Sequence, residues 1–459
     1  MCGVFGVRSL ERDVARLAYF GLYALQHRGQ ESAGIAVSDR GRLTVLRDMG
    51  LVAHVFSEQQ LQALPGDVAI GHTRYSTTGS NLWANAQPVV HHGRERRVAL
   101  GHNGNLTNTS ELREELVADG VRFSSSSDTE VIAALLAREP GPLPEAVAHT
   151  TARLQGAYSV VALADDTLVA FRDRHGIRPL ELGRIGSDWV LASESCAFDL
   201  IGAEWERGVR PGEVVWIDEE GLHSAQVEPE GPGALCIFEH VYFARPDSRL
   251  GGTEVHGARV RMGQRLAEEA PVEADLVMPI PDSGTPAAIG FAKTSGIPYE
   301  EGLIKNRYVG RTFIQPDQAL REQGIRLKFN PLDEIAGRRI VIVDDSIVRG
   351  NTIKALVATL FEAGAMEVHV RVSSPPIVSP CFYGIDMPDE DLLVAATRTV
   401  EQVRELIGAT TLAYLSLEGM TRASRRPAGT VCRACFTRDY PTAAPTTGRL
   451  AKLRFEEAR

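Results

Sequence analysis

The sequence predicts a two-part chain of the α/β and α+β classes, with a parallel sheet in its second half. Residues 1 to about 230 contain short apolar strand patterns and few helices, without regular alternation of the two. Beyond them, apolar strands alternate with amphipathic helices, a pattern typical of a mainly parallel sheet. Residues 228–233 contain two prolines and two glycines, which indicates a boundary. We therefore predict domains at 2–233 and 234–440 and a tail at 441–459.

Composition restricts the class of protein. A chain of 459 residues can form two or three domains, and 44% hydrophobic with 24% charged residues is ordinary for a globular protein. The net charge of −10 argues against a nucleic-acid or anionic-membrane partner. The sequence contains no apolar run of about 18 residues and no signal-peptide pattern at its start. We expect a cytoplasmic protein.

In the first half, apolar runs predict strands at 66–71, 98–102 and 157–163. A helix is predicted at 128–138, because its apolar residues recur at helical spacing. The polar motifs of this half can therefore be assigned to the ends of predicted strands and helices.

In the second half, an apolar strand at 276–280 precedes a helix at 287–293. A second buried strand, 339–343, is followed by a helix at 352–363 with one apolar face, and then by a strand at 368–372. Parallel strands joined by helices place a ligand site at their carboxyl ends.

Cys2 is the first candidate catalytic residue. If Met1 is removed, the Cys2 thiol lies beside an α-amine whose reference pKa is about 7.7–8.0. Such an amine can take the thiol proton, which pairs a nucleophile with its own base. Any residue can follow an initiator methionine, so this position alone is weak support for catalysis.

Polar residues at the ends of predicted strands strengthen that interpretation. Asn103 and Gly104 can offer a side-chain amide and a backbone N–H to one oxygen, as an oxyanion hole requires. Asn-Gly is also a common hairpin turn. Arg74 can equally be a surface cation, and Asp128, which follows four serines, can be a helix N-cap.

Two further segments support the catalytic interpretation. Cys-Gly-Val-Phe-Gly at 2–6 and Gln-His-Arg-Gly-Gln-Glu-Ser-Ala-Gly at 26–34, together with the motifs above, resemble the glutaminase domain of the N-terminal-nucleophile amidotransferases. The resemblance implies a four-layer αββα domain that binds glutamine. It also implies Cys2 as nucleophile, Asn103 and Gly104 as oxyanion donors, and Arg28, Arg74 and Asp128 as glutamine-binding residues.

A second motif lies at 342–352, Ile-Val-Asp-Asp-Ser-Ile-Val-Arg-Gly-Asn-Thr. Backbone N–H groups at a helix start suit a phosphate. Asp344 and Asp345 suit ribose hydroxyls and Mg²⁺, which prefers oxygen ligands. An Asp-rich surface turn is the alternative, but the buried strand before the motif and the amphipathic helix after it favour a binding loop.

This motif resembles the phosphoribosyl pyrophosphate fingerprint of the type I phosphoribosyltransferases. Asn351 departs from it, since threonine is usual there, but its backbone N–H is unchanged. The resemblance implies that Mg²⁺ is held by Ser283, Asp344 and Asp345. It implies phosphoribosyl pyrophosphate contacts from Asp282, Ser283, Gly284, Lys305, Tyr308, Arg311, Asp344, Asp345, Ser346, Ile347, Val348, Arg349, Gly350, Asn351 and Thr352.

Cysteines form the third motif. Cys432 and Cys435 make a C-x-x-C pair, with Cys381 and Cys236 far upstream. Four thiolates can hold a [4Fe–4S] cluster or a structural Zn²⁺, and spacing alone favours Zn²⁺ or a thiol pair. Cys196 has no such pattern around it and is predicted to be a packed core thiol.

The segments around Cys381 and Cys435, taken with both halves, resemble the iron–sulfur branch of the glutamine phosphoribosylpyrophosphate amidotransferase family. That branch often carries a short propeptide, whereas only Met1 precedes Cys2 here. The resemblance implies the committed step of purine synthesis, which yields 5-phosphoribosylamine, pyrophosphate and glutamate. It also implies a homotetramer inhibited by purine nucleotides. The implied [4Fe–4S] ligands are Cys236, Cys381, Cys432 and Cys435.

Two other functions compete with this one. A different enzyme with the same glutaminase half would need a sugar isomerase or ATP-pyrophosphatase half, which the Asp344-Asp345 loop disfavours. A non-catalytic sensor of phosphoribosyl pyrophosphate would not need Cys2, Arg74 and Asn103 together. The sequence therefore favours the two-site enzyme.

Overall fold

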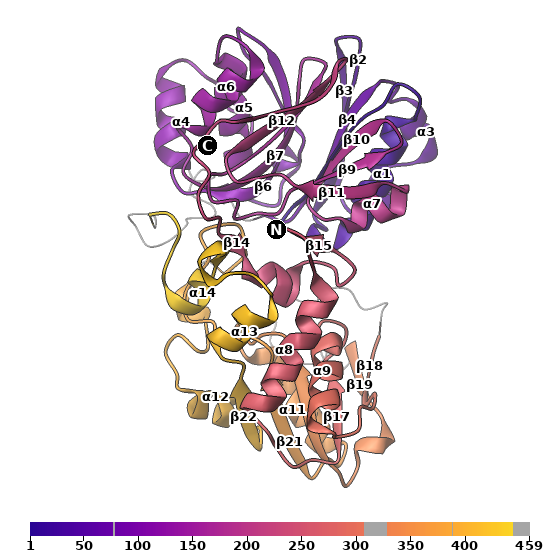
Figure 1. Ribbon diagram of the computed structural model, residues 1–459, viewed down its shortest axis with the longest axis vertical. Helices are drawn as coiled ribbons and strands as arrows, with labels where there is room; N and C mark the ends of the chain where they lie inside the picture. Colours follow the sequence, from indigo (N-terminus) through magenta and orange to yellow (C-terminus); the bar gives the residue numbers. More distant parts are fainter. Residues whose placement is uncertain (77–78, 307–327, 388, 444–459) are drawn as a thin grey trace.

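The computed structural model describes residues 1–76, 79–306, 328–387 and 389–443. It contains two lobes, one from each half of the chain, and the N-terminus lies at their junction (Figure 1). Met1 is buried there in a core shared with residues of the second half.

Two antiparallel sheets form the first lobe. The seven-stranded sheet has the order β11-β9-β10-β1-β4-β2-β3, and the six-stranded sheet has the order β13-β12-β8-β7-β6-β5. The first comprises β1 (Gly3–Arg8), β2 (Ser32–Asp39), β3 (Arg42–Met49), β4 (Val68–Arg74), β9 (Glu181–Ile185), β10 (Asp188–Ala192) and β11 (Glu204–Gly208). The second comprises β5 (Val89–His92), β6 (Arg97–Leu106), β7 (Gly156–Ala164), β8 (Thr167–Arg172), β12 (Glu213–Asp218) and β13 (Gly221–Gln226).

These sheets pack face to face, with an apolar core drawn from both, and helices cover each outer face. The result is the αββα layering that the resemblance implied. The helices on the seven-stranded sheet are α1 (Val14–Ala24), α2 (Val52–Val55), α3 (Glu58–Gln62) and α7 (Cys196–Ile201). Those on the six-stranded sheet are α4 (Thr109–Ala118), α5 (Asp128–Arg138) and α6 (Leu143–Thr151).

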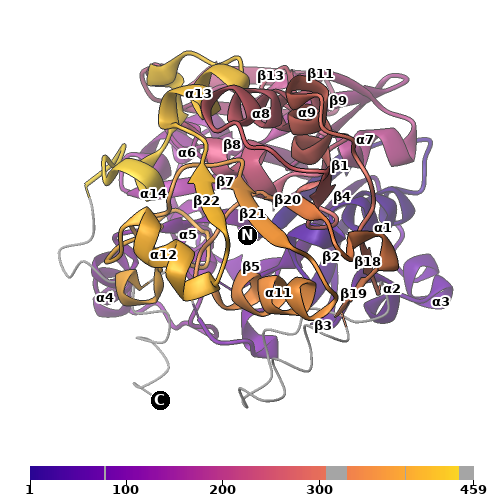
Figure 2. The same cartoon turned by 90° about the horizontal axis from the view of Figure 1, so that it is seen from below.

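A four-stranded parallel sheet organises the second lobe, in the order β17-β20-β21-β22. Helices lie on both of its faces (Figure 2). The strands are β17 (Leu276–Pro279), β20 (Arg339–Asp344), β21 (Glu367–Val372) and β22 (Thr411–Tyr414). One face carries α8 (Val255–Glu269), α9 (Thr285–Ser295) and α13 (Leu417–Ala423), and the other carries α11 (Asn351–Glu362) and α12 (Val400–Ile407).

Short elements complete this lobe. A five-residue π-helix, η3 (Glu239–Phe243), follows the first strand of the half and begins beside the junction with the first lobe. The others are β14 (Leu235–Cys236), β15 (Arg249–Leu250), β16 (Thr253–Glu254), β18 (Leu303–Lys305), β19 (Phe329–Pro331), β23 (Val431–Cys432) and α14 (Ala434–Thr437).

The predicted fold class is confirmed, and the predicted helix at 128–138 coincides with α5. Each of the other elements predicted from periodicity is present, with its ends shifted by a few residues. The hairpin alternative for Asn103-Gly104 is wrong, because β6 continues through both residues to Leu106. The limits 2–233, 234–440 and 441–459 remain predictions. No helix in the described ranges is both long and apolar enough to cross a membrane.

Candidate functional site

Cys2 immediately precedes β1, a central strand of its sheet, and is 7% exposed. The Tyr75 N–H donates to Cys2 Sγ at 3.5 Å, and the Cys2 N–H donates to Asn103 Oδ1 at 3.2 Å. Burial raises the pKa of the Cys2 thiol. A thiol in this state needs a base to become a nucleophile.

Asn103 supplies a donor beside that thiol. Its side chain is buried, and within the described ranges its amide Nδ2 has no hydrogen-bond partner. Gly104 follows with φ of +150°, and a Cβ there would lie 2.0 Å from the Ala157 carbonyl oxygen. The strand thus requires glycine at 104. The Nδ2 group of Asn103 is a buried donor with no partner in the described ranges, as an oxyanion hole requires.

Arg74 and Asp128 are both buried, which excludes a solvated surface cation at Arg74. Arg74 ends β4, and its Nη1 donates to the Ser80 carbonyl at 3.0 Å. Asp128 begins α5, whose N-cap is Ser127, so Asp128 is not the cap. Burial raises the pKa of Asp128, but His102 and the Leu106 N–H outweigh it, and the net pKa is lowered. Asp128 is therefore an ionised carboxylate.

Sequence reasoning missed Asn85, which joins the loops that carry these two charges. Its Nδ2 donates to the Ser80 carbonyl and to Ser126 Oγ, each at 2.9 Å. Its Oδ1 accepts from the Ser126 N–H at 2.9 Å. One amide thus fixes the separation of the Arg74 and Asp128 loops, a role that no local motif around residue 85 indicates.

Arg28 occupies a different place from the one predicted. Its side chain is fully buried, and its Nε donates to the Cys2 carbonyl oxygen at 2.9 Å. Its two Nη groups contact Glu194 and Glu239. With these donors already used, the geometry does not support a contact between Arg28 and glutamine. It places Arg28 behind the nucleophile.

In the second lobe, Asp344 ends β20 and Asp345 opens the loop that leads to α11. Gly350 has φ of +80° and precedes the first helical residue, Asn351. Burial and the neighbouring Asp345 raise the pKa of Asp344. Burial also raises the pKa of Asp345, although a hydrogen bond from Ser283 opposes that rise. Two adjacent carboxylates with raised pKa values, Asp345 buried and Asp344 partly buried, favour binding of a cation.

Residues 282–284, which are predicted to contact phosphoribosyl pyrophosphate, lie in a loop against this strand. The Ile280 N–H donates to the Val343 carbonyl at 2.9 Å, and a Cβ on Gly284 would lie 2.3 Å from that same oxygen. Glycine at 284 therefore lets the two loops meet. Lys305 Nζ lies 2.5 Å from Asp282 Oδ2. Ser283 hydrogen-bonds to Asp345, whose N–H donates to Asp344 Oδ1 at 2.9 Å. Tyr308 and Arg311, which are predicted to bind the same substrate, lie outside the described residues.

All four cysteines of the third motif are buried in one apolar core. Cys236 is the register partner of Cys432 where β14 pairs with β23. The thiol of Cys435 is raised in pKa by burial and by the other three thiols, so the four are electrostatic neighbours. In the described part of the chain, no group of three or more His, Cys, Asp or Glu side chains has the arrangement of a metal site.

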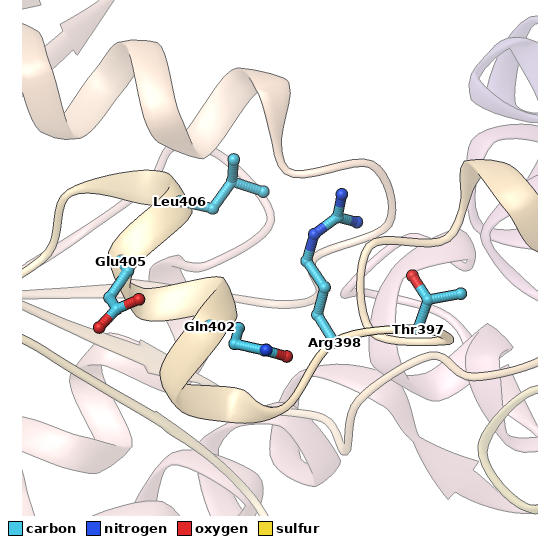
Figure 3. Close-up of a pocket in the computed structure, with 5 residues that line it drawn as sticks. All are labelled: Thr397, Arg398, Gln402, Glu405 and Leu406. Atoms are coloured by element: carbon cyan, nitrogen blue, oxygen red, sulfur yellow. The ribbon is translucent and has the colours of Figure 1, made fainter.

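A separate hollow of about 510 Å³ lies on the surface at α12 (Figure 3). It contains none of the predicted site residues. Its lining residues are Thr397, Arg398, Gln402, Glu405 and Leu406.

Comparisons with known proteins find relatives of both halves of the chain. A family model described as a glutamine amidotransferase domain matches residues 72–199, and a phosphoribosyl transferase domain matches residues 258–374. The amidophosphoribosyltransferase of Synechococcus elongatus is 52% identical, with 99% of this chain and 94% of that protein covered. That of Bacillus subtilis is 46% identical, with coverage of 96% and 94%.

A comparison with solved structures also finds a similar protein over the whole chain. The glutamine phosphoribosylpyrophosphate amidotransferase from B. subtilis, complexed with ADP and GMP, superposes with a TM-score of 0.92. The two sequences are 45% identical, and the match covers 98% of this chain and 99% of that one. Agreement in sequence and in fold therefore extends over both lobes, and on these grounds the chain belongs to the amidophosphoribosyltransferase family.

Proposed function

We propose that two active sites, one in each lobe, carry the reaction of this enzyme. The reaction is the first step of purine biosynthesis and uses glutamine and phosphoribosyl pyrophosphate. The observation that carries the assignment of the glutaminase site is the Cys2 thiol beside Asn103, whose buried Nδ2 has no hydrogen-bond partner among the described residues. The test is steady-state release of pyrophosphate with glutamine, with ammonium or with neither. Release with neither donor would contradict coupled amination.

In the first site, the Cys2 thiol attacks the glutamine side-chain amide after its own α-amine has taken the thiol proton. Asn103 Nδ2 and the Gly104 N–H hold the oxyanion. The protonated α-amine then gives its proton to the leaving nitrogen, and ammonia departs as the thioester forms. Water then releases glutamate. Arg74 and Asp128 hold the α-carboxylate and the α-ammonium of glutamine, each by opposite charge.

Retention of Met1 is expected to silence this site. The Met1 side chain is buried, and the Cys2 nitrogen is an amide while Met1 is attached. An amide nitrogen cannot accept the thiol proton. Intact-mass measurement of protein fractions, each assayed for glutaminase turnover, checks this. Normal turnover in protein whose mass includes Met1 would contradict it.

Ammonia then reaches the second site through the contact between the lobes. Asn105 Nδ2 donates to the Phe382 carbonyl at 3.2 Å, and Tyr75 Oη donates to Asp386 Oδ2 at 3.3 Å. A Cβ on Gly384 would lie 3.0 Å from the backbone of Gly104. Residues 382–386 thus cover the oxyanion strand, and exclusion of water there keeps ammonia unprotonated.

In the second site, the loop from Ser346 to Thr352 binds the 5′-phosphate through backbone N–H groups at the start of α11. Asp344 and Asp345 bind the ribose diol, and with Ser283 they would hold Mg²⁺, which offsets the charge of the pyrophosphate group. Ammonia attacks the anomeric carbon and pyrophosphate leaves. The products are 5-phosphoribosylamine and pyrophosphate.

Asp345→Asn is expected to raise the phosphoribosyl pyrophosphate and Mg²⁺ requirement with either amine donor. Loss of one charged ligand of a polar site costs about 1.5–3 kcal/mol, roughly ten- to a hundredfold. Initial rates at varied Mg²⁺, with ammonium as donor, measure the effect. Unchanged kinetics would show that this loop does not bind the substrate.

We further infer that Cys236, Cys381, Cys432 and Cys435 hold a [4Fe–4S] cluster. The donor set fits, since four buried thiols lie in one core beside the Arg178 guanidinium. Arg178 Nε and Nη2 are buried and have no partner among the described residues. Such donors suit a cluster with net negative charge. No catalytic step is assigned to it.

Assembly, regulation and location also remain proposals. We infer a homotetramer in the cytoplasm that is inhibited by purine nucleotides. The support for inhibition is that the similar B. subtilis structure is complexed with ADP and GMP. Light scattering gives the oligomeric state, and initial rates with added AMP or GMP test the inhibition.

A further inference from the structure

Glu239 is a fully buried carboxylate held between two arginines at the junction of the lobes. It is the first residue of the π-helix η3. Arg28 grips it as a fork, with Nη2 2.9 Å from Oε1 and Nη1 3.1 Å from Oε2. Arg178 Nη1 donates to Oε1 at 3.3 Å from the other side. Both arginines are fully buried.

This carboxylate sets the orientation of the group behind the nucleophile. Arg28 Nε donates to the Cys2 carbonyl oxygen, and a planar guanidinium that is held by a bidentate carboxylate cannot rotate freely. Glu194 takes Arg28 Nη1 as well. Because Cys2 immediately precedes β1 and is not itself part of the strand, this contact with its carbonyl helps to fix the backbone that carries the thiol.

The segment that carries Glu239 is itself held. Arg259, from α8, donates from Nε to the His240 carbonyl and from Nη2 to the Ala244 carbonyl, each at 2.8 Å. These two carbonyls lie at either end of η3. Isolated π-helical turns are uncommon and occur often at functional sites. The position of Glu239 is thus set by the second lobe, although its contacts are in the first.

We propose that Glu239 and Arg178 are positioning residues for the Cys2 nucleophile, acting through Arg28. The second lobe thereby completes the glutaminase site of the first. The inference rests on the proposed role of Cys2 as nucleophile. Neither Glu239 nor Arg178 touches the thiol, so their effect is on the placement and the charge environment of the Cys2 backbone.

The charges of Glu239, Arg28 and Arg178 should affect how glutaminase activity depends on pH. The buried amine beside Cys2 is that of Met1, and its pKa is lowered to about 5, mainly by burial. Arg28 and Arg178 lower this pKa, whereas Cys2 and Glu239 raise it. The Cys2 amine, the base of the proposed mechanism, lies next to this position. Loss of the Glu239 charge should lower the pKa of that base, and loss of the Arg178 charge should raise it.

Glu239→Gln is expected to reduce kcat with glutamine about 10- to 100-fold, because small misplacements of a nucleophile cost that much. KM for glutamine should stay unchanged, since Arg74 and Asp128 hold the substrate. Ammonium-dependent synthesis should also be unchanged. The acidic limb of the glutaminase pH profile should move to lower pH in this variant and to higher pH in Arg178→Gln.

Glu213→Gln is the matched control. Glu213 is a fully buried carboxylate in an arginine fork, with Arg207 Nη1 and Nη2 at 2.8 and 2.9 Å. Glu213 lies on β12, which β7 and β8 separate from β6. Loss of this carboxylate should cost stability and leave kcat and the pH limbs as in the wild type. A shifted pH limb in the control would assign the Glu239 effect to general loosening and overturn the inference.

Wild-type kcat and pH profile in folded Glu239→Gln would also overturn it. If Glu239→Gln does not fold, the test rests on Arg178→Gln. An unchanged acidic limb of the glutaminase pH profile in Arg178→Gln would contradict the proposed positioning role. Glutaminase activity that survives alkylation of Cys2 in the wild type would instead overturn the proposed role of Cys2. The two failures are therefore distinguishable.

Discussion

Cys2→Ala is expected to abolish glutamine-dependent synthesis and to leave synthesis from ammonium salts at the wild-type rate. The thiol contacts the Tyr75 N–H, and its backbone N–H contacts Asn103, both in the first lobe. Residues 282–284 and 344–352, which are proposed to bind phosphoribosyl pyrophosphate, lie at or after the carboxyl ends of β17 and β20 in the second lobe. The thiol therefore has no part in the displacement of pyrophosphate.

Pyrophosphate release, measured at saturating glutamine and at saturating ammonium, separates the two reactions. Cys196→Ser is the control, since Cys196 is another buried thiol, in α7, whose Sγ lies 3.8 Å from Glu194 Oε2 and 3.9 Å from the Ala24 carbonyl oxygen. This control should keep both activities. Loss of both activities in folded Cys2→Ala would contradict the division into two sites.

The sequence was most informative where chemistry and local structure coincide. The motif at 342–352 runs from the end of a buried strand to the start of an amphipathic helix, and β20 and α11 place it there. From the sequence alone, Gly104 and Gly284 could be identified only as glycines near a predicted site. Their reasons, close approaches to the Ala157 and Val343 carbonyls, appear only when distant strands are brought together.

Long-range pairing explains what sequence reasoning missed. Arg28 and Glu239 are 211 residues apart, and nothing around either one marks it as the partner of the other. A glutamine contact for Arg28 followed from its motif, whereas its actual partners come from three separate segments. Asn85 was missed for the same reason, since the loops it joins are 41 and 5 residues away.

Loss of the metal that we propose for the four-cysteine site is expected to destabilise the second lobe. The ligands come from β14, from the segment after β21 and from the region of β23 and α14. A metal here would therefore tie together parts of the chain that are 145 and 51 residues apart. Because metal binding free energy is coupled to folding, Cys435→Ser should lower the free energy of unfolding by more than about 4 kcal/mol.

The thiols also give this site a pH dependence. Burial, opposed in part by Arg178, raises the pKa of Cys236 to about 11, and burial raises the pKa of Cys432 further. Without a metal these thiols are protonated at neutral pH, so metal binding must release their protons. Retention of the metal should therefore weaken as pH falls.

Anaerobically purified protein should be brown and contain about four iron and four sulfide per chain, the stoichiometry of one cluster. Purification in air should inactivate the enzyme slowly, even with Cys2 intact, because oxygen attacks such clusters. Cys196→Ser should keep both colour and stability, since its thiol is buried apart from the four. If anaerobically purified protein is colourless and contains stoichiometric zinc, the four thiols hold a structural zinc ion and the proposed cluster is wrong. The zinc would then serve only to link distant segments of the chain.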